Sequence, residues 1–242
     1  MVVSPTRSAP KLSASQLADY LVAPTPIGQI GILRQAKSPG QHKPLIIQYQ
    51  FARRCISACL QSPANIGKAV AAAVHLLEQR HDDTSNGPLV RDDAERSIDV
   101  IQIFQRSLNV LDIGGAQFER ALNPSPSLIL SGVEITVWPD AIATLAARNS
   151  TTRIGQVFVR CTIGASGDTA ENRRAEANGH LATIAHMHTA AFLLDRGIPH
   201  APTSMVIDVP RGNVVRGPVN ATRRVANIEA ACGMIAAIWP TI

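Results

Sequence analysis

Long apolar runs and aromatic side chains are both scarce in this sequence. No apolar run reaches the roughly 20 residues that a membrane-spanning helix needs, so we expect no membrane segment. The first fifteen residues contain no apolar core of a secretory signal, and we expect a cytoplasmic protein with a disordered lead over residues 1–12. Aromatic residues make up 4% of the chain, which argues against a base-stacking platform of the kind found in single-strand-binding proteins.

Cysteine is also sparse, and the four cysteines all lie in apolar periodic segments, where a free thiol behaves as a small hydrophobe. Cys55 and Cys59 are one helical turn apart, but no second Cys/His pair stands at zinc-finger spacing. The nucleotide-binding patterns GxGxxG and GxxxxGK[ST] are absent. We therefore expect neither a zinc site nor a nucleotide-binding loop of these kinds.

What the sequence does contain is a large apolar fraction and an excess of positive charge. With 242 residues and 45% hydrophobic side chains, the chain can bury a substantial core, and the same fraction allows a homo-oligomer or a protein partner. The formal net charge of +5 favours a polyanionic partner such as DNA. Binding of that kind depends on a clustered basic face, which net charge alone does not establish.

The first half of the chain predicts helices. Ser13 or Ser15 can cap a short helix that ends near Leu21. Apolar residues at helical spacing recur over 43–60, 64–80 and 91–111. We expect a helical region over residues 13–123, which either forms a separate lobe or covers one face of a sheet.

The second half changes to the alternation of strands, with Val133, Ile135 and Val137 as its clearest instance. The expected elements are strands over 128–137 and 156–163 with a hairpin connection over 140–153, a helix over 169–194, strands over 204–209 and 214–216, and a last helix over 220–238. We predict an α/β (α+β) fold, a helical N-terminal half followed over residues 124–242 by a small mixed β-sheet flanked by helices. A single compact domain over 13–242 is the alternative.

Two charged residues lie beside the predicted strands. Asp140 follows Pro139, and it can hold a divalent cation if a second acid arrives from the next strand. Alternatively it satisfies backbone N–H groups in a turn. Arg160 lies inside an apolar strand, where a cation must be paired or reach an edge. It either clamps a phosphate or pairs with Asp140 or Glu134.

The order of a strand, a Pro-Asp pair, a strand with a cation, a long helix and a strand resembles the PD-(D/E)XK nuclease-like superfamily, especially its RecB- and Cas4-like branch. The resemblance implies a restriction-endonuclease-like core, and active members bind magnesium or manganese through the motif acids and cut DNA. Asp140 matches the first acid and Arg160 the motif lysine. Phe158 stands where the second acid belongs and cannot bind metal, so the resemblance is to a degenerate member.

Other residues bear on this resemblance. Where the branch has Gln and Tyr on the following helix, this chain has Asn178, His180 and His186. His186 and His188 point to nearly opposite sides of that helix and share no metal face. Acids migrate in this superfamily, and a replacement for the missing acid can come from Glu134 or from one of the earlier acids Glu95, Asp99 and Glu119.

Basic residues gather in two places. The first group flanks Pro39 and comprises Arg34, Lys37, Lys43, Arg53 and Arg54. The second group surrounds the final turn and the start of the last helix, and we take it as the candidate nucleic-acid-binding set: Arg211, Arg216, Arg223 and Arg224. The alternative for the second group is a solvated helix face paired with Asp208 and Glu229.

Three functions remain open at this point. The first is a nucleic-acid-associated protein with a nuclease-like fold that has lost its catalytic set and acts by binding, in nucleic-acid transactions or prokaryotic defence. It needs no cofactor. The second is an active magnesium- or manganese-dependent deoxyribonuclease with a relocated acid, in which Asp140 binds the metal and Arg160 is catalytic. The third is a protein–protein interaction module that docks through its helical half.

Overall fold

The computed structural model describes residues 6–39, 47–121, 124–147 and 151–242. The helices in these ranges are α1 (Ala14–Leu21), α2 (Pro26–Lys37), α3 (Gln50–Gln61), α4 (Ile66–Asp82), α5 (Pro88–Ser107), α6 (Asp168–Phe192) and α7 (Thr222–Ile238). The strands are β1 (Lys11–Ser13), β2 (Gln117–Arg120), β3 (Ser127–Leu130), β4 (Val133–Thr136), β5 (Ala141–Ala146), β6 (Thr152–Arg160), β7 (Ile198–Pro199), β8 (Met205–Asp208) and β9 (Asn213–Arg216). The predicted α/β class is confirmed: a helical N-terminal half precedes mixed β-structure flanked by helices.

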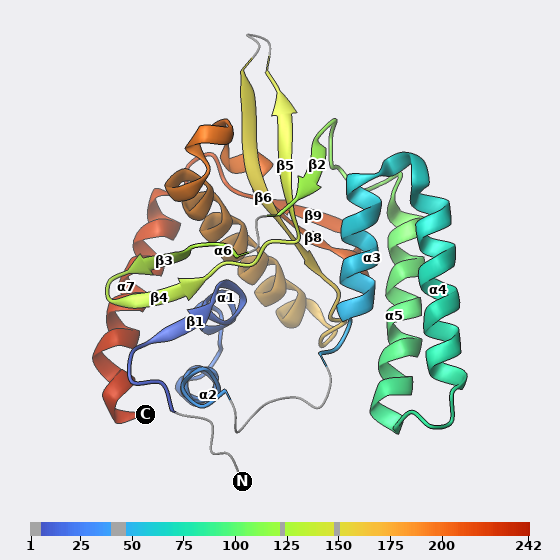
Figure 1. Ribbon diagram of the computed structural model, residues 1–242. Coiled ribbons are helices and arrows are strands. Elements are labelled where there is room, and N and C mark those ends of the chain that lie inside the picture. Colours follow the sequence, from blue (N-terminus) through green and yellow to red (C-terminus); the bar gives the residue numbers. More distant parts are fainter. Residues whose placement is uncertain (1–5, 40–46, 122–123, 148–150) are drawn as a thin grey trace.

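The strands form two sheets. The larger one has the order β2-β5-β6-β8-β9, with β7 paired to the outer part of β6. Strand β6 runs antiparallel to β5 and parallel to β8, so this sheet is mixed. The smaller sheet has the order β1-β4-β3. In Figure 1 the long β5–β6 hairpin rises beyond the rest of the larger sheet.

Two apolar layers enclose the larger sheet. Helices α3, α4 and α5 share one core cluster with the side chains of Ala141, Val157, Val159 and Ile207. Helices α1, α2, α6 and α7 share the other cluster, which includes Phe158 of β6 and Val206 of β8. Figure 1 shows α3, α4 and α5 side by side next to the strands. The early helices α3–α5 therefore cover one face of the sheet and do not form a separate lobe.

A local capping signal sets the start of α1, whereas a distant contact accompanies the start of α3. Ser13 caps α1, since its Oγ accepts from the N–H of Gln16 at 3.1 Å and the Gln16 side chain accepts from the Ser13 N–H at 2.9 Å. Helix α3 begins later than the periodicity predicts, at Gln50, because Tyr49 has a left-handed φ of 59° and its N–H donates to Asp93 at 2.7 Å. Residues 43–46 of the expected helix lie outside the described residues.

The predicted hairpin over 140–153 is present, but its first strand is not the expected strand over 133–137. Ala141–Ala146 forms strand β5, and it is β5 that pairs with β6. Strands β3 and β4 lie in the smaller sheet. Ala141, Ile142 and Ala143 are all fully buried, so both faces of β5 are apolar and the strand lacks the alternation that marks a half-exposed one.

Two other boundaries differ from the sequence analysis. The end of the expected disordered lead is ordered, because Lys11 and Leu12 pair in parallel with β4 and Leu12 is fully buried. Residues 1–5 lie outside the described part of the chain. Gln117–Arg120, placed in the helical region, forms β2 at the edge of the larger sheet. Both segments are short strands whose pairing partners are distant in sequence, and local patterns do not reveal such partners.

Candidate functional site

Asp140 lies at a bend between β4 and β5, and its backbone and side chain are both anchored. Its N–H donates to the carbonyl oxygen of Val157 at 2.8 Å. Its Oδ2 accepts a hydrogen bond from the N–H of Val159 at 2.7 Å. Its carbonyl oxygen accepts one from Oγ of Ser57 in α3 at 2.7 Å. These contacts agree with the turn interpretation of Asp140, in which the residue satisfies backbone N–H groups.

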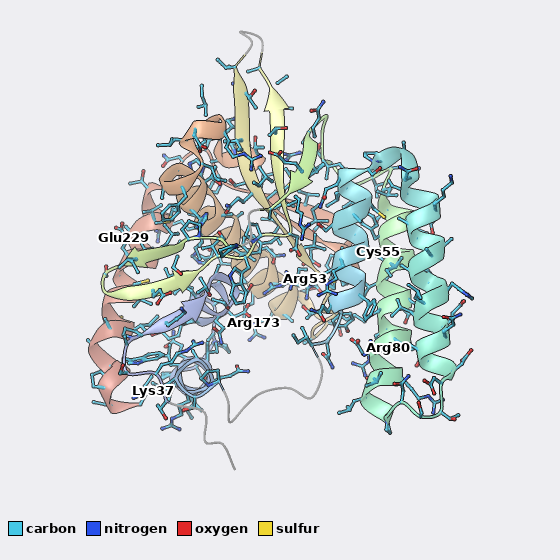
Figure 2. The ribbon with its side chains drawn as sticks, viewed as in Figure 1. Lys37, Arg53, Cys55, Arg80, Arg173 and Glu229 are labelled. Carbon is cyan, nitrogen blue, oxygen red and sulfur yellow. The ribbon has the colours of Figure 1, made fainter. Side chains whose placement is uncertain are left out.

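Asp140 also forms an ion pair with Arg53 of α3. Nη2 of Arg53 lies 3.0 Å from Oδ1 and 3.1 Å from Oδ2, and Nε lies 3.2 Å from Oδ1. Burial raises the pKa of Asp140, while the charge of Arg53 and the Val159 amide act in the opposite direction. Burial acts to lower the pKa of Arg53. The charge of Asp140 and its hydrogen bond outweigh burial, so the pKa of Arg53 is raised. In Figure 2, Arg53 lies on the side of α3 that faces the strands.

The surroundings of Asp140 do not fit a divalent cation. Both of its carboxylate oxygens already accept from Arg53, and one also accepts from a backbone N–H. A hard cation such as Mg²⁺ needs free oxygen ligands at about 2.0–2.1 Å. Within the described ranges, no three His, Cys, Asp or Glu side chains gather as a metal-binding group. A metal at Asp140 would first have to displace the guanidinium.

The four acids considered as replacements lie elsewhere. Glu134 in β4 pairs with Lys11, with Nζ 2.6 Å from Oε1, and this contact lowers the pKa of Glu134. Glu119 in β2 pairs with Arg196 at 2.6 Å. Glu95 and Asp99 lie on the exposed side of α5.

Arg160 points to the face of β6 opposite Asp140. It lies two residues after Phe158, and alternate residues of a strand share a face. Phe158 is 6% exposed and packs in the cluster of α1 and α6, whereas Val157 and Val159 pack on the side of α3. The structure therefore does not bring together the two residues predicted to be catalytic.

The predicted pairing of Arg160 with Asp140 or Glu134 is also wrong. Its Nη2 lies 2.8 Å from Oδ1 of Asp19 in α1, and its Nη1 donates to Oδ1 of Asn178 in α6 at 2.9 Å. The sequence gives no sign of the Asp19 contact, because 141 residues separate it from Arg160.

Asp208, at the end of β8, is the centre of a buried polar cluster that the sequence analysis missed. It is 1% exposed, and its carboxylate accepts from Nε and Nη2 of Arg174 and from Nδ2 of Asn178. Asn178 links this carboxylate to Arg160, the residue beside Asp208 in the β6–β8 register. An acid at the end of an apolar strand was the only available signal. The cluster ties β6, β8 and α6 together.

Two of the four arginines of the candidate nucleic-acid-binding set are paired with α6. Arg211 makes a bidentate pair with Glu171, with Nη2 2.5 Å from Oε1, and also donates to the carbonyl oxygens of Ile163 and Ala165. Arg224 of α7 pairs with Glu176 of α6, with Nη2 3.0 Å from Oε1. Arg211 therefore ties the loop after β6 to the start of α6, and Arg224 ties α7 to α6.

The other two arginines differ in their surroundings. Arg216 donates from Nη1 to a backbone carbonyl of η3 (Ala201–Thr203), and its Nη2 lies 3.4 Å from Oδ1 of Asp112. Arg223 is exposed at the start of α7. The expected pairing of this group with Asp208 and Glu229 is wrong, since Arg174 occupies Asp208. The set does not make one free basic surface.

Two of the α6 histidines, His180 and His188, belong to the core, and His186 is half-buried. His180 is 6% exposed and His188 is fully buried. Burial lowers the pKa of His180, His186 and His188, so all three are neutral at pH 7. Nε2 of His188 lies 2.8 Å from the carbonyl oxygen of Pro126 and donates to it, which leaves Nδ1 to accept from Gln156. Neutral imidazoles contribute no phosphate-binding charge.

A cavity of about 770 Å³ lies beside Asp140, between α3 and the β4–β5 connection. We call it the α3 groove. Its polar and aromatic lining includes Arg53, Arg54, Arg120, Trp138 and Asp140. Arg54 and Arg120 are exposed, and neither forms an ion pair or hydrogen bond with another described residue. The groove therefore presents two positive charges that Asp140 does not balance.

The sequence held partial signals for this groove. Arg53 and Arg54 form a doublet in the first basic group, and Asp140 was singled out. Trp138 follows the buried alternation of β4, and its position directly before Pro139-Asp140 could have marked it as an exposed aromatic residue. Arg120 carries no local signal, because it reaches the groove only through the pairing of β2 with β5.

The family context of the chain was tested by comparison with known proteins. Among the described residues, no helix is long and apolar enough to cross a membrane. The comparisons with protein-family models, curated proteins and solved structures found no match to this chain.

Proposed function

We propose that this protein binds nucleic acid through the α3 groove and does not cut it. The observation that carries the proposal is that the arginines of the groove differ in their ion pairing. Arg53 neutralises Asp140, the residue that would have to bind a catalytic metal, while Arg54 and Arg120 line the same groove with no carboxylate partner among the described residues. The groove can attract phosphates but holds no acid free for metal-assisted hydrolysis.

The strand order supports a nuclease-like ancestry. Strand β5 follows Asp140 and pairs antiparallel with β6, α6 follows β6, and β8 returns parallel to β6. Apart from β5, which lies between Asp140 and β6, this is the element order on which the resemblance to the PD-(D/E)XK nuclease-like superfamily rests. We propose that the chain is a degenerate member of that superfamily, in which Phe158 has become part of the core and Arg53 occupies the surviving acid.

Charge supports the choice of a polyanion as the ligand. Guanidinium groups bind phosphate oxygens with two parallel hydrogen bonds, and two such groups beside one groove can contact successive phosphates. The chain as a whole carries a formal charge of +5, which favours encounter with a polyanion. We propose that this binding serves nucleic-acid transactions, for example in prokaryotic defence.

Replacing Arg54 and Arg120 together by alanine is expected to weaken nucleic-acid binding. Each lost phosphate contact reduces the slope of log K against log salt concentration by about 0.7 for a single strand and about 0.9 for a duplex, so the double variant should lose about 1.4 to 1.8. Fluorescence anisotropy of a labelled oligonucleotide, titrated at several salt concentrations, measures this slope.

The matched control removes the same charge elsewhere. Arg34 of α2 and Arg106 of α5 are exposed and do not line the groove. Their double alanine variant should retain most of the wild-type slope. Equal losses of slope in the two double variants would show that binding depends on net charge alone and would contradict binding through the α3 groove.

A further inference from the structure

The chain has two tryptophans, and they occupy opposite environments. Trp239 is 1% exposed, and its Nε1–H donates to the carbonyl oxygen of Arg7 at 3.3 Å. Trp138 is 68% exposed and lines the α3 groove. The exposed indole of Trp138 is therefore free to contact a ligand in this basic groove.

The backbone holds Trp138 firmly even though its ring is free. Val137, on one side, is fully buried in the core of α1 and α6. Pro139 restricts the backbone on the other side, and Asp140 is fixed by Val157, Val159 and Arg53. The indole is thus presented by a rigid segment, and binding through it requires little ordering of the chain.

We propose that Trp138 stacks on an unpaired base, so that the α3 groove selects single-stranded over duplex nucleic acid. This inference rests on the proposed function. A duplex hides the faces of its bases and offers this groove only phosphates, which Arg54 and Arg120 contact equally in either form. A single strand also offers base faces, on which aromatic side chains stack without regard to sequence. The neutral base of a single strand therefore matches the indole ring, and its phosphates match the two guanidinium groups.

The size and composition of the groove agree with this ligand. Its volume of about 770 Å³ lies in the range of about 300–1,000 Å³ typical of small-ligand sites, which suits one base together with its sugar and phosphates. The low aromatic content of the chain argues against a platform of several stacked rings, and the described lining of this groove contains one ring. We therefore expect one stacked base and a short footprint.

Trp138→Ala tests the inference by affinity. The probes are a labelled thymine homo-oligonucleotide, which forms no internal pairs, and a duplex of the same length, both followed by anisotropy. Wild type should bind the single strand more tightly, and the variant should lose roughly five- to 150-fold of that affinity while its duplex affinity and salt slope stay unchanged. Because the ring is mostly exposed, the variant should fold normally, which a urea titration checks.

Trp138→Phe adds an optical test. Phenylalanine keeps an aromatic face, so this variant should still bind the single strand. Wild-type tryptophan fluorescence should be quenched by the single strand, whereas in the variant the remaining Trp239 should stay unquenched because it is buried.

The outcomes separate this inference from the proposed function. Equal affinity for both probes, unchanged by Trp138→Ala, would overturn the stacking inference and leave groove binding of phosphates intact. No binding of either probe by the wild type would overturn both, and would favour a protein as the occupant of the groove.

Discussion

Replacing Asp208 by alanine is expected to lower the free energy of unfolding by about 3–5 kcal/mol, because it leaves the guanidinium of Arg174 buried without its carboxylate. Asp208 is 1% exposed and the Arg174 side chain 11%. Asn178 loses the acceptor for its Nδ2 in the same variant. Urea denaturation at constant m-value measures the change.

A surface pair provides the control. Asp92 and Arg96 form an i,i+4 pair on α5, with side chains 42% and 50% exposed. Asp92→Ala should cost less than about 1 kcal/mol. If Asp208→Ala were no more costly than Asp92→Ala, the polar cluster would not hold β6, β8 and α6 together, and the position of Arg160 would need another explanation.

Gly155→Ala is the second substitution with a large expected effect. A Cβ at Gly155 would lie well under 3.0 Å from backbone atoms of Thr203 and Ser204, a distance that real Cβ atoms essentially never show. Those atoms belong to the backbone beside β6 and cannot rotate away. We expect a loss of several kcal/mol, of the order of the largest single-substitution effects, or failure to fold. Thermal unfolding and soluble yield report it.

Gly67→Ala is the matched control with the opposite sign. Gly67 lies in α4, and a Cβ there would meet nothing within 4 Å. Replacing glycine by alanine where the native backbone suits both residues stabilises a protein by about 0.4–1 kcal/mol, chiefly because it restricts the unfolded chain, so this variant should unfold at a slightly higher temperature. A Gly155→Ala protein as stable as Gly67→Ala would contradict the close approach of η3 to β6.

The elements that sequence predicts best are those whose signals are local. Helical spacing and the Ser13 cap located the helices to within a few residues, except where Tyr49 adopts a left-handed conformation and delays the start of α3. Strand β6 was also found, through its run of β-branched residues. These features depend on neighbours within about four residues, and periodicity captures such neighbours.

Strand partners could not be predicted in the same way. The alternation of Val133, Ile135 and Val137 marks a strand but not which sheet it joins. The antiparallel partner of β6 is β5, whose alanine-rich sequence carries little strand propensity. Pairing also depends on packing against helices such as α3, which lies far away in sequence.

The site was predicted in part for the same reason. Asp140 was identified by its local context, but its partner Arg53 lies 87 residues earlier. Arg160 was expected beside it, yet the period of two places Arg160 with Phe158 on the opposite face. Phe158, which stands where the second acid was sought, lies in the core, as expected for an apolar side chain inside a central strand.

The most direct test of binding without cleavage follows the fate of a bound strand. Labelled DNA is incubated with the protein and Mg²⁺ or Mn²⁺, then run on a native gel and on a denaturing gel. We predict a shifted band on the first gel and full-length DNA on the second, with either metal. Metal-dependent cleavage that disappears in a folded Asp140→Ala variant would contradict the account. It would show that Asp140 gives up its ion pair with Arg53 and binds a catalytic cation itself.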